Sequence, residues 1–203
     1  MNDIKRYLSL FPDTNKMLLK AAGVLFIVAL IAETASIFTI GPLVGILFLF
    51  ENDIIELIAI VALVAGTFAD RRLLIVFGVI IILVMNGRWW LTHPLTWHVL
   101  CYAALDLGAY AITLVLLLLP RTNSSRVLPA LAVLIAVVKI IDIAANAIAL
   151  IGVCISPLDV VDVAFYAARV IALQAGIACV ACAVATGVAK KRTGAMAATI
   201  PEK

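Results

Sequence analysis

Runs of about twenty apolar residues follow one another along this chain and decide what it can fold into. Of its 203 residues, 66% are hydrophobic and only 13% are charged, whereas a soluble domain carries charge on about a quarter of its positions. A run of this length, bounded by short polar segments, matches a helix that crosses the hydrocarbon core of a bilayer. The sequence therefore predicts an all-α fold, a polytopic integral membrane helical bundle in contact with lipid.

Six such runs predict about six transmembrane helices joined by short connectors. The predicted helices cover residues 17–39, 54–69, 73–91, 98–119, 127–154 and 160–189. They form a single membrane domain, residues 17–189. We expect residues 1–16 to be a cytoplasmic segment, either a short interfacial helix or a frayed end. Residues 190–203 are expected to be a disordered basic cytoplasmic tail.

The segment at 41–56 leaves three conformations open. Gly41-Pro42 is a natural helix break, because proline lacks the backbone donor and clashes with the preceding turn. The residues that follow form a re-entrant piece, a tilted extension, or the start of a longer second helix. The last alternative is the least favourable, since it would bring Glu51, Asp53 and Glu56 deep into lipid.

The distribution of basic residues predicts the orientation of the helices. With the N-terminus in the cytoplasm, nearly every basic residue at or beyond the ends of the predicted helices falls on the cytoplasmic side: Lys5, Arg6, Lys16, Lys20, Arg71, Arg72, Arg121, Arg126, Lys190, Lys191 and Arg192. On the other side Arg88 is the single base, among Glu51, Asp53, Glu56, Asp159 and Asp162. Positive residues favour the cytoplasmic side, so both termini are predicted there, most simply in a bacterial cytoplasmic membrane. Trp89, Trp90 and Trp97 suit the external interface.

Five charged residues interrupt the predicted helices, and they are the best indication of function in the sequence. They are Glu33, Asp106, Lys139, Asp142 and Arg169. A charge at the centre of a bilayer costs about 2.5–3.5 kcal/mol on insertion scales, so it persists where it has a partner, a water-filled cavity or a function. From the helix directions, all five are expected in one layer in the middle-to-outer part of the membrane.

Further polar residues follow these charges at helical spacing. On three of the helices the polar stripes comprise His98, Tyr102, Asp106 and Thr113; Lys139, Asp142 and Asn146; and Asp162, Tyr166 and Arg169. The opposite faces carry Leu, Ile and Val, so the stripes are expected to face protein and the aliphatic faces lipid. A spacing of three residues lets Lys139 pair with Asp142. Glu33 and Asp106 would then compete for Arg169, leaving one acid unpaired.

This excess carboxylate favours the binding or transport of a small solute, ion or proton through a polar intramembrane site. Asp106 is the predicted substrate or proton carboxylate, Glu33 the second choice, and Arg169 the counter-charge. The remaining candidate residues are Lys139, Asp142, Asn146, Tyr102, Tyr166 and His98. The alternative is a non-transporting accessory or assembly protein, whose charges pair within the bundle, with a second copy, or with a partner membrane subunit.

Two short segments resemble parts of known transporters. Gly66-Thr67-Phe68-Ala69-Asp70-Arg71-Arg72 resembles a shortened form of the loop after the second helix in major facilitator transporters, Gly-x-x-x-Asp-Arg-x-Gly. The match covers seven residues and lacks the second Gly. Gly41-Pro42-Leu43-Val44-Gly45 is similar to a helix opening in the S components of vitamin-uptake systems, which are also six-helix membrane proteins. Both resemblances imply transport.

The sequence offers little for catalysis, a cofactor or a metal. It contains no H-E-x-x-H, G-x-S-x-G or phosphate-binding glycine loop, and His93 and His98 alone make a poor metal site. Cys179 and Cys182 form a C-x-x-C, which we interpret as two packing cysteines inside a helix. Cys101 and Cys154 could form a disulfide, but nothing requires it. A net charge of +3 gives no reason to expect a nucleic acid partner.

Overall fold

The computed structural model describes residues 14–39, 54–92, 97–118, 127–153 and 157–197. These residues contain six helices and no strand: α2 (Lys16–Thr39), α4 (Ile54–Phe68), α5 (Arg72–Thr92), α6 (Trp97–Leu118), α7 (Val127–Val153) and α8 (Pro157–Ala197). The all-α fold is therefore confirmed, and the ends of the first five helices agree with the prediction to within one residue. The interfacial helix expected in 1–16 and the segment 41–53 lie almost entirely outside the described residues.

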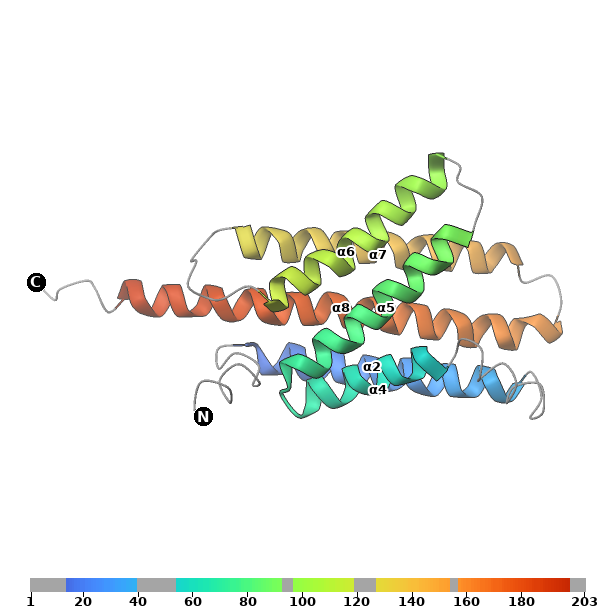
Figure 1. The fold of residues 1–203 in the computed structure, drawn as a ribbon, viewed down its shortest axis with the longest axis horizontal. Coiled ribbons are helices and arrows are strands. Elements are labelled where there is room, and N and C mark those ends of the chain that lie inside the picture. The colour runs from blue at the N-terminus through green and yellow to red at the C-terminus, as the bar shows by residue number, and fades with distance from the viewer. Residues whose placement is uncertain (1–13, 40–53, 93–96, 119–126, 154–156, 198–203) are drawn as a thin grey trace, which may run out of the picture.

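Helix α8 is longer than predicted. It has 41 residues and continues to Ala197, where we expected disorder from residue 190. The residues of this extension include alanine, lysine and arginine, which are good helix formers, so the helix does not end with the apolar run. At about 1.5 Å per residue it is roughly 60 Å long, and its C-terminal part extends beyond the other helices (Figure 1). Residues 198–203 lie outside the described part of the chain.

Local contacts explain where α2 begins and where α4 ends. The side-chain oxygen of Asn15 accepts hydrogen bonds from the N–H groups of Met17 (3.1 Å) and Leu18 (3.3 Å), so Asn15 is the N-cap of α2. After α4, Asp70 has a φ of 55°, and the N–H of Arg71 donates to the carbonyl of Gly66 at 2.8 Å. A left-handed residue with a 6→1 bond of this kind ends a helix and reverses the chain.

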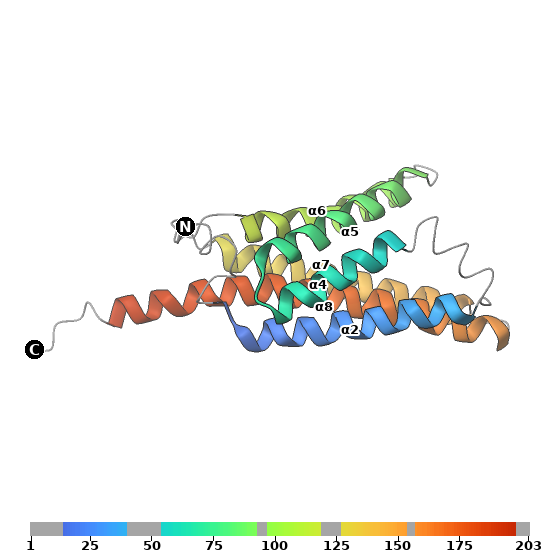
Figure 2. The same ribbon diagram turned by 60° about the horizontal axis from the view of Figure 1, so that its bottom comes forward.

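The six helices form a closed ring. Each packs against its neighbour in the chain, and α2 closes the ring by packing extensively against α8. Successive helices run in opposite directions, with α2, α7 and α8 nearly parallel to one axis and α5 and α6 crossing them obliquely (Figures 1 and 2). Consequently α8 lies between α2 on one side and α6 and α7 on the other.

The surface of the ring carries many large apolar side chains. Among the described residues, three helical segments are long and apolar enough to cross a membrane: Lys16–Ser36, Arg72–Thr92 and Ala164–Thr186. Ile54–Phe68 and Ala103–Leu118 are shorter apolar helices. Large aliphatic side chains are exposed on the outside, for example Val133, Val137 and Ile140 on α7, whereas Ala132 and Ile135 on the same helix are buried. An outer surface of this kind is expected in a protein that contacts lipid.

Candidate functional site

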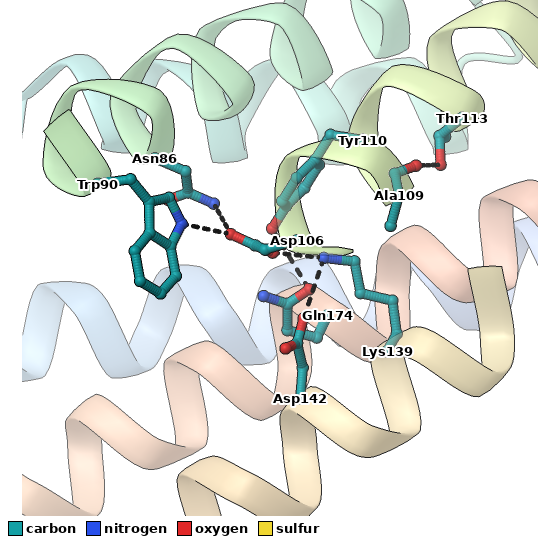
Figure 3. A network of polar contacts seen from close by, with 9 residues as sticks. All are labelled: Asn86, Trp90, Asp106, Ala109, Tyr110, Thr113, Lys139, Asp142 and Gln174. Carbon is teal, nitrogen blue, oxygen red and sulfur yellow. Dashed lines mark hydrogen bonds and ion pairs between the residues drawn. The ribbon is translucent and has the colours of Figure 1, made fainter. Parts of the chain in front are cut away.

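Lys139 is the centre of a cluster of polar side chains between α6 and α7 (Figure 3). Its side chain is completely buried. The Nζ atom is 2.8 Å from Oδ1 of Asp106 on α6 and 3.4 Å from Oδ2 of Asp142, one turn further along α7. The same ammonium group lies 3.9 Å from the ring centroid of Tyr110, a cation–π distance. One buried cation thus interacts with two carboxylates and an aromatic face.

The Asp106 carboxylate accepts hydrogen bonds from two neighbouring helices. Its Oδ2 accepts hydrogen bonds from Nδ2 of Asn86 at 3.4 Å and Nε1 of Trp90 at 3.3 Å, both from α5. Together with Lys139, three donors from two neighbouring helices therefore surround Asp106. The carboxylate is thereby held in place between α5 and α7.

The cluster reaches α8 through Tyr110. The Tyr110 hydroxyl donates a hydrogen bond to Oε1 of Gln174 at 3.4 Å, and both residues are buried. A buried tyrosine normally finds a partner for its hydroxyl, and Gln174 satisfies this one. We call the set Asn86, Trp90, Asp106, Tyr110, Lys139, Asp142 and Gln174 the Lys139 cluster. It contains side chains from four helices, α5 to α8 (Figure 3).

A second group of charges lies on the other side of α8. The guanidinium of Arg169 is 2.7 Å from Oε2 of Glu33 on α2 and 3.3 Å from Oε2 of Glu56 on α4. Its Cζ lies 5.0 Å from the ring centroid of Tyr166, one turn earlier on α8. We call Glu33, Glu56, Tyr166 and Arg169 the Arg169 cluster. Glu33 is almost completely buried, whereas Glu56 and Arg169 keep part of their side chains exposed.

Helix geometry separates the two clusters. Arg169 and Gln174 are five residues apart on α8, which corresponds to about 7.5 Å along the axis and roughly 140° around it. Arg169 therefore faces α2 and α4, while Gln174 faces Tyr110 on α6. Helix α8 therefore divides the charges into two sets, whereas their shared depth in a membrane stays a prediction.

The pairing of the charges agrees with the prediction in one respect and differs in another. Lys139 contacts Asp142 as the i,i+3 spacing predicted. Asp106, however, does not compete with Glu33 for Arg169, because it bonds to Lys139 instead. Glu56, predicted near the external end of the helix over 54–69, lies in the first turn of α4 and reaches Arg169, a contact that was not predicted. Each cluster therefore contains one cation and two carboxylates.

The structure describes only some of the other candidate residues in full. His98 and Tyr102 belong to α6 and Asn146 to α7, but their side chains lie outside the described part of the structure. On the α6 stripe, Asp106 and Thr113 are buried and Tyr166 on α8 is half-exposed. The expectation that polar stripes face protein is thus confirmed for Asp106, Thr113, Lys139 and Asp142.

Sequence reasoning missed five members of the clusters. Trp90 was interpreted as an interfacial aromatic, Glu56 as an acid at the external side, and Asn86, Tyr110 and Gln174 were not singled out. Asn86 and Gln174 interrupt strongly apolar helices, and a polar residue in such a run is a usable signal of a buried partner.

The described residues offer free thiols but no group of side chains suited to a metal ion. Cys101 is an exposed free thiol, and Cys179 and Cys182 are half-buried free thiols on α8, with Cys154 outside the described part. Within the described ranges no three His, Cys, Asp or Glu side chains converge in a way that could hold a metal ion. Among the described residues, the Lys139 cluster and the Arg169 cluster are therefore the candidate functional sites.

Comparisons with protein-family models, curated proteins and solved structures found no match for this chain. The described residues define an all-helical protein with three helical segments able to cross a membrane and two buried ion clusters on opposite sides of α8.

Proposed function

We propose that this chain is a multi-pass membrane protein that binds or transports a small solute, an ion or protons through a polar site within its bundle. In this proposal all six helices cross the bilayer, and both termini are cytoplasmic. The alternation of helix directions supports this topology, since it brings Lys16, Lys20, Arg71 and Arg72 to one end of the bundle (Figure 1). Basic residues favour the cytoplasmic side of a membrane.

The observation that supports the function best is the ratio of charges. The Lys139 cluster contains Asp106 and Asp142 around one lysine, and the Arg169 cluster contains Glu33 and Glu56 around one arginine. Among the contacts of the described residues, each cation thus faces two carboxylates. Acidic groups gathered within an apolar bundle suit a ligand with positive charge, and intramembrane charges of this kind mark ion or proton sites.

The second candidate function is assembly without transport. It is supported by the pairing of both cations, the buried Lys139 and the partly buried Arg169, with carboxylates of the same chain, as expected of charges that fix helix register. The buried position of these residues argues against their use as contacts for a second copy or a partner subunit. Such a partner would have to bind the apolar exterior instead.

A ligand screen tests the proposal. The purified protein is heated in the presence of candidate solutes and cations across a range of pH, in parallel with Asp106→Asn and with Asp70→Asn, a carboxylate outside both clusters. We expect a ligand or pH condition that raises the Tm of the wild type and of Asp70→Asn, but not that of Asp106→Asn. A Tm that responds to no ligand and no pH change, in all three proteins, would count against a binding site and favour the assembly function.

A further inference from the structure

The Arg169 cluster leaves several of its hydrogen-bonding atoms unused. Both ion pairs of Arg169 involve Nη1, which contacts Oε2 of Glu33 and Oε2 of Glu56. A guanidinium carries five N–H donors on three nitrogens, and within the described part of the chain Nε and Nη2 have no hydrogen-bond partner. The same holds there for Oε1 of Glu56. Unused donors and an unused acceptor therefore belong to one ion pair.

These unused atoms can be reached from the surface. The side chains of Arg169 and Glu56 are 18% and 21% exposed, whereas that of Lys139 is 0% exposed. Among the described residues, Oδ1 of Asp70 is the single side-chain oxygen or nitrogen that is both buried and without a partner. The unused atoms of Arg169 and Glu56 are therefore not enclosed, and a ligand can contact them without opening the bundle.

The shape of the guanidinium defines one half of a ligand. Its Cζ lies over the ring of Tyr166 at 5.0 Å, so the ring helps to hold the group in place. Nε and Nη2 share one edge of the guanidinium plane, and this edge matches two oxygens of a carboxylate or phosphate group. An oxyanion is therefore the group that suits the unused edge of Arg169.

The charge of the cluster defines the other half. One arginine and two glutamates give a formal charge of −1. A simple anion on Arg169 would be repelled by both carboxylates. A simple cation on Glu56 would leave the donors of Arg169 without an acceptor. A zwitterion satisfies both side chains at once and leaves the net charge of the site unchanged.

We propose that the Arg169 cluster binds a zwitterion in which a primary ammonium group and a carboxylate or phosphate group are joined by a few carbon atoms. Its oxyanion accepts hydrogen bonds from Nε and Nη2 of Arg169, and its ammonium group donates to Oε1 of Glu56. Free amino acids and the headgroup of phosphatidylethanolamine share this chemistry. The inference rests on the proposed function and names the class of its ligand.

Binding of soluble probes tests the class of ligand. The full-length protein in a nonionic detergent is heated with a mixture of the neutral amino acids, with glycerophosphoethanolamine, with ethanolamine as the cation alone, or with glycerol 3-phosphate as the anion alone. We expect at least one zwitterionic probe to raise the Tm in a saturable way. The two probes with a single charge should have no effect at the same concentration.

Nanodiscs distinguish the two sources of the zwitterion. The protein is placed in phosphatidylcholine with or without phosphatidylethanolamine, because the quaternary ammonium of choline has no N–H to donate to Glu56. A Tm raised by phosphatidylethanolamine and by glycerophosphoethanolamine, but not by the amino acids, identifies a lipid headgroup. A Tm raised by the amino acids alone identifies a free solute.

Three variants connect the binding with the named atoms. Arg169→Lys keeps the charge but removes the paired donors, so the Kd of the zwitterion should rise by about tenfold or more. Glu56→Gln removes the acceptor charge and leaves one arginine with one glutamate. It should weaken the zwitterion and allow glycerol 3-phosphate to bind, which a purely structural role of Glu56 would not produce. Asp70→Asn should leave every Kd unchanged.

The outcomes separate this inference from the proposed function. Equal responses to ethanolamine and to the zwitterions would overturn the inference, and so would zwitterion binding that persists in both Arg169→Lys and Glu56→Gln. A response to pH or to metal cations that Asp106→Asn removes, without a response to any zwitterion, would support the proposed function and contradict the inference. The absence of every response would contradict both.

Discussion

Lys139 is the residue whose loss should affect stability most. It is completely buried and contacts both Asp106 and Asp142. In Lys139→Met the two carboxyls would remain buried without their cation, and breaking a buried pair by removing one partner typically costs about 3–5 kcal/mol. We expect a loss of this size in the free energy of unfolding, measured in detergent micelles by circular dichroism.

Two further variants make this prediction specific. Lys20→Met removes an exposed lysine at the start of α2 and should change the stability by less than about 0.5 kcal/mol. The triple variant Lys139→Met, Asp106→Asn, Asp142→Asn should recover part of the loss, because it removes the unbalanced charges together. If the triple variant were less stable than Lys139→Met, charge imbalance would not be the cause.

The two glutamates of the Arg169 cluster should differ in their contribution. Glu33 is 2% exposed and lies 2.7 Å from Arg169, whereas the side chain of Glu56 is 21% exposed and the distance is 3.3 Å. Hydrogen bonds to buried charged groups contribute more than exposed ion pairs. Glu33→Gln should therefore cost about 1.5–3 kcal/mol and Glu56→Gln less than about 1 kcal/mol, measured by the same unfolding experiment. Equal costs would contradict this assignment.

For single residues, the sequence identified the charges and the pairing within one helix, but not the pairings between helices. Glu33, Asp106, Lys139, Asp142 and Arg169 could be found because charges are rare in apolar helices. A pairing within one helix follows from spacing, as for Lys139 and Asp142. Pairings between helices depend on the rotation of each helix about its axis, which the packing of many side chains determines together. For this reason the sequence did not reveal that Asp106 bonds to Lys139 rather than Arg169.

Among the helices, the contact between α2 and α8 depends on a glycine. A Cβ atom added at Gly176 would lie 2.4 Å from Cε1 of Phe26 and within 3 Å of two more atoms of the same ring. Phe26 is completely buried, so the ring cannot turn away into open space. Small residues of this kind let membrane helices approach closely.

Gly176→Ala should therefore destabilise the protein, by about 1–3 kcal/mol as expected for an overpacked interior. Gly108→Ala is the matched control. It is also within a helix, but a Cβ there would meet no atom within 4 Å, so the substitution should be neutral or stabilise by up to about 1 kcal/mol through helix propensity. The stabilities of the two variants are compared by thermal unfolding. A loss of stability in Gly108→Ala equal to that in Gly176→Ala would show that the Phe26 contact is not responsible.

The helices were the most predictable elements of the fold. Apolar runs end abruptly at Pro, Gly and charged residues, so five of the six could be predicted to within one residue. The end of α8 could not, because Ala, Lys and Arg continue a helix after the apolar run has ended. Periodicity also predicted the buried faces of α6 and α7, on which Asp106, Thr113 and Lys139 lie.

For the whole molecule, the ring of helices explains why two separate clusters can exist. Helix α8 packs against α2 on one side and against α6 and α7 on the other. Its Arg169 therefore balances acids from α2 and α4, while Gln174 joins the cluster of α5, α6 and α7. A proton that moved through the bundle by way of both clusters would have to pass α8. This arrangement could not be predicted from apolar periodicity and residue spacing, because neither shows which helices close the ring.

The proposed topology predicts which residues a reagent outside the cell can reach. In a background without the four native cysteines, a single cysteine is introduced at Arg71, at the α4–α5 turn, or at Leu91, near the far end of α5. Both positions are exposed, Leu91 at 80%. A membrane-impermeant maleimide added to intact bacterial cells should label Leu91→Cys and should not label Arg71→Cys, because positive residues remain in the cytoplasm.

Opening the membrane provides the control for this experiment. After permeabilisation, Arg71→Cys should react as well as Leu91→Cys, which shows that its earlier protection came from the membrane rather than from burial. A third position, Lys16→Cys at the start of α2, should behave like Arg71→Cys, since two antiparallel helices separate these sites along the chain. Labelling of Arg71→Cys but not Lys16→Cys in intact cells would mean that α2 and α4 together do not cross the bilayer twice, and the six-span topology would then be wrong.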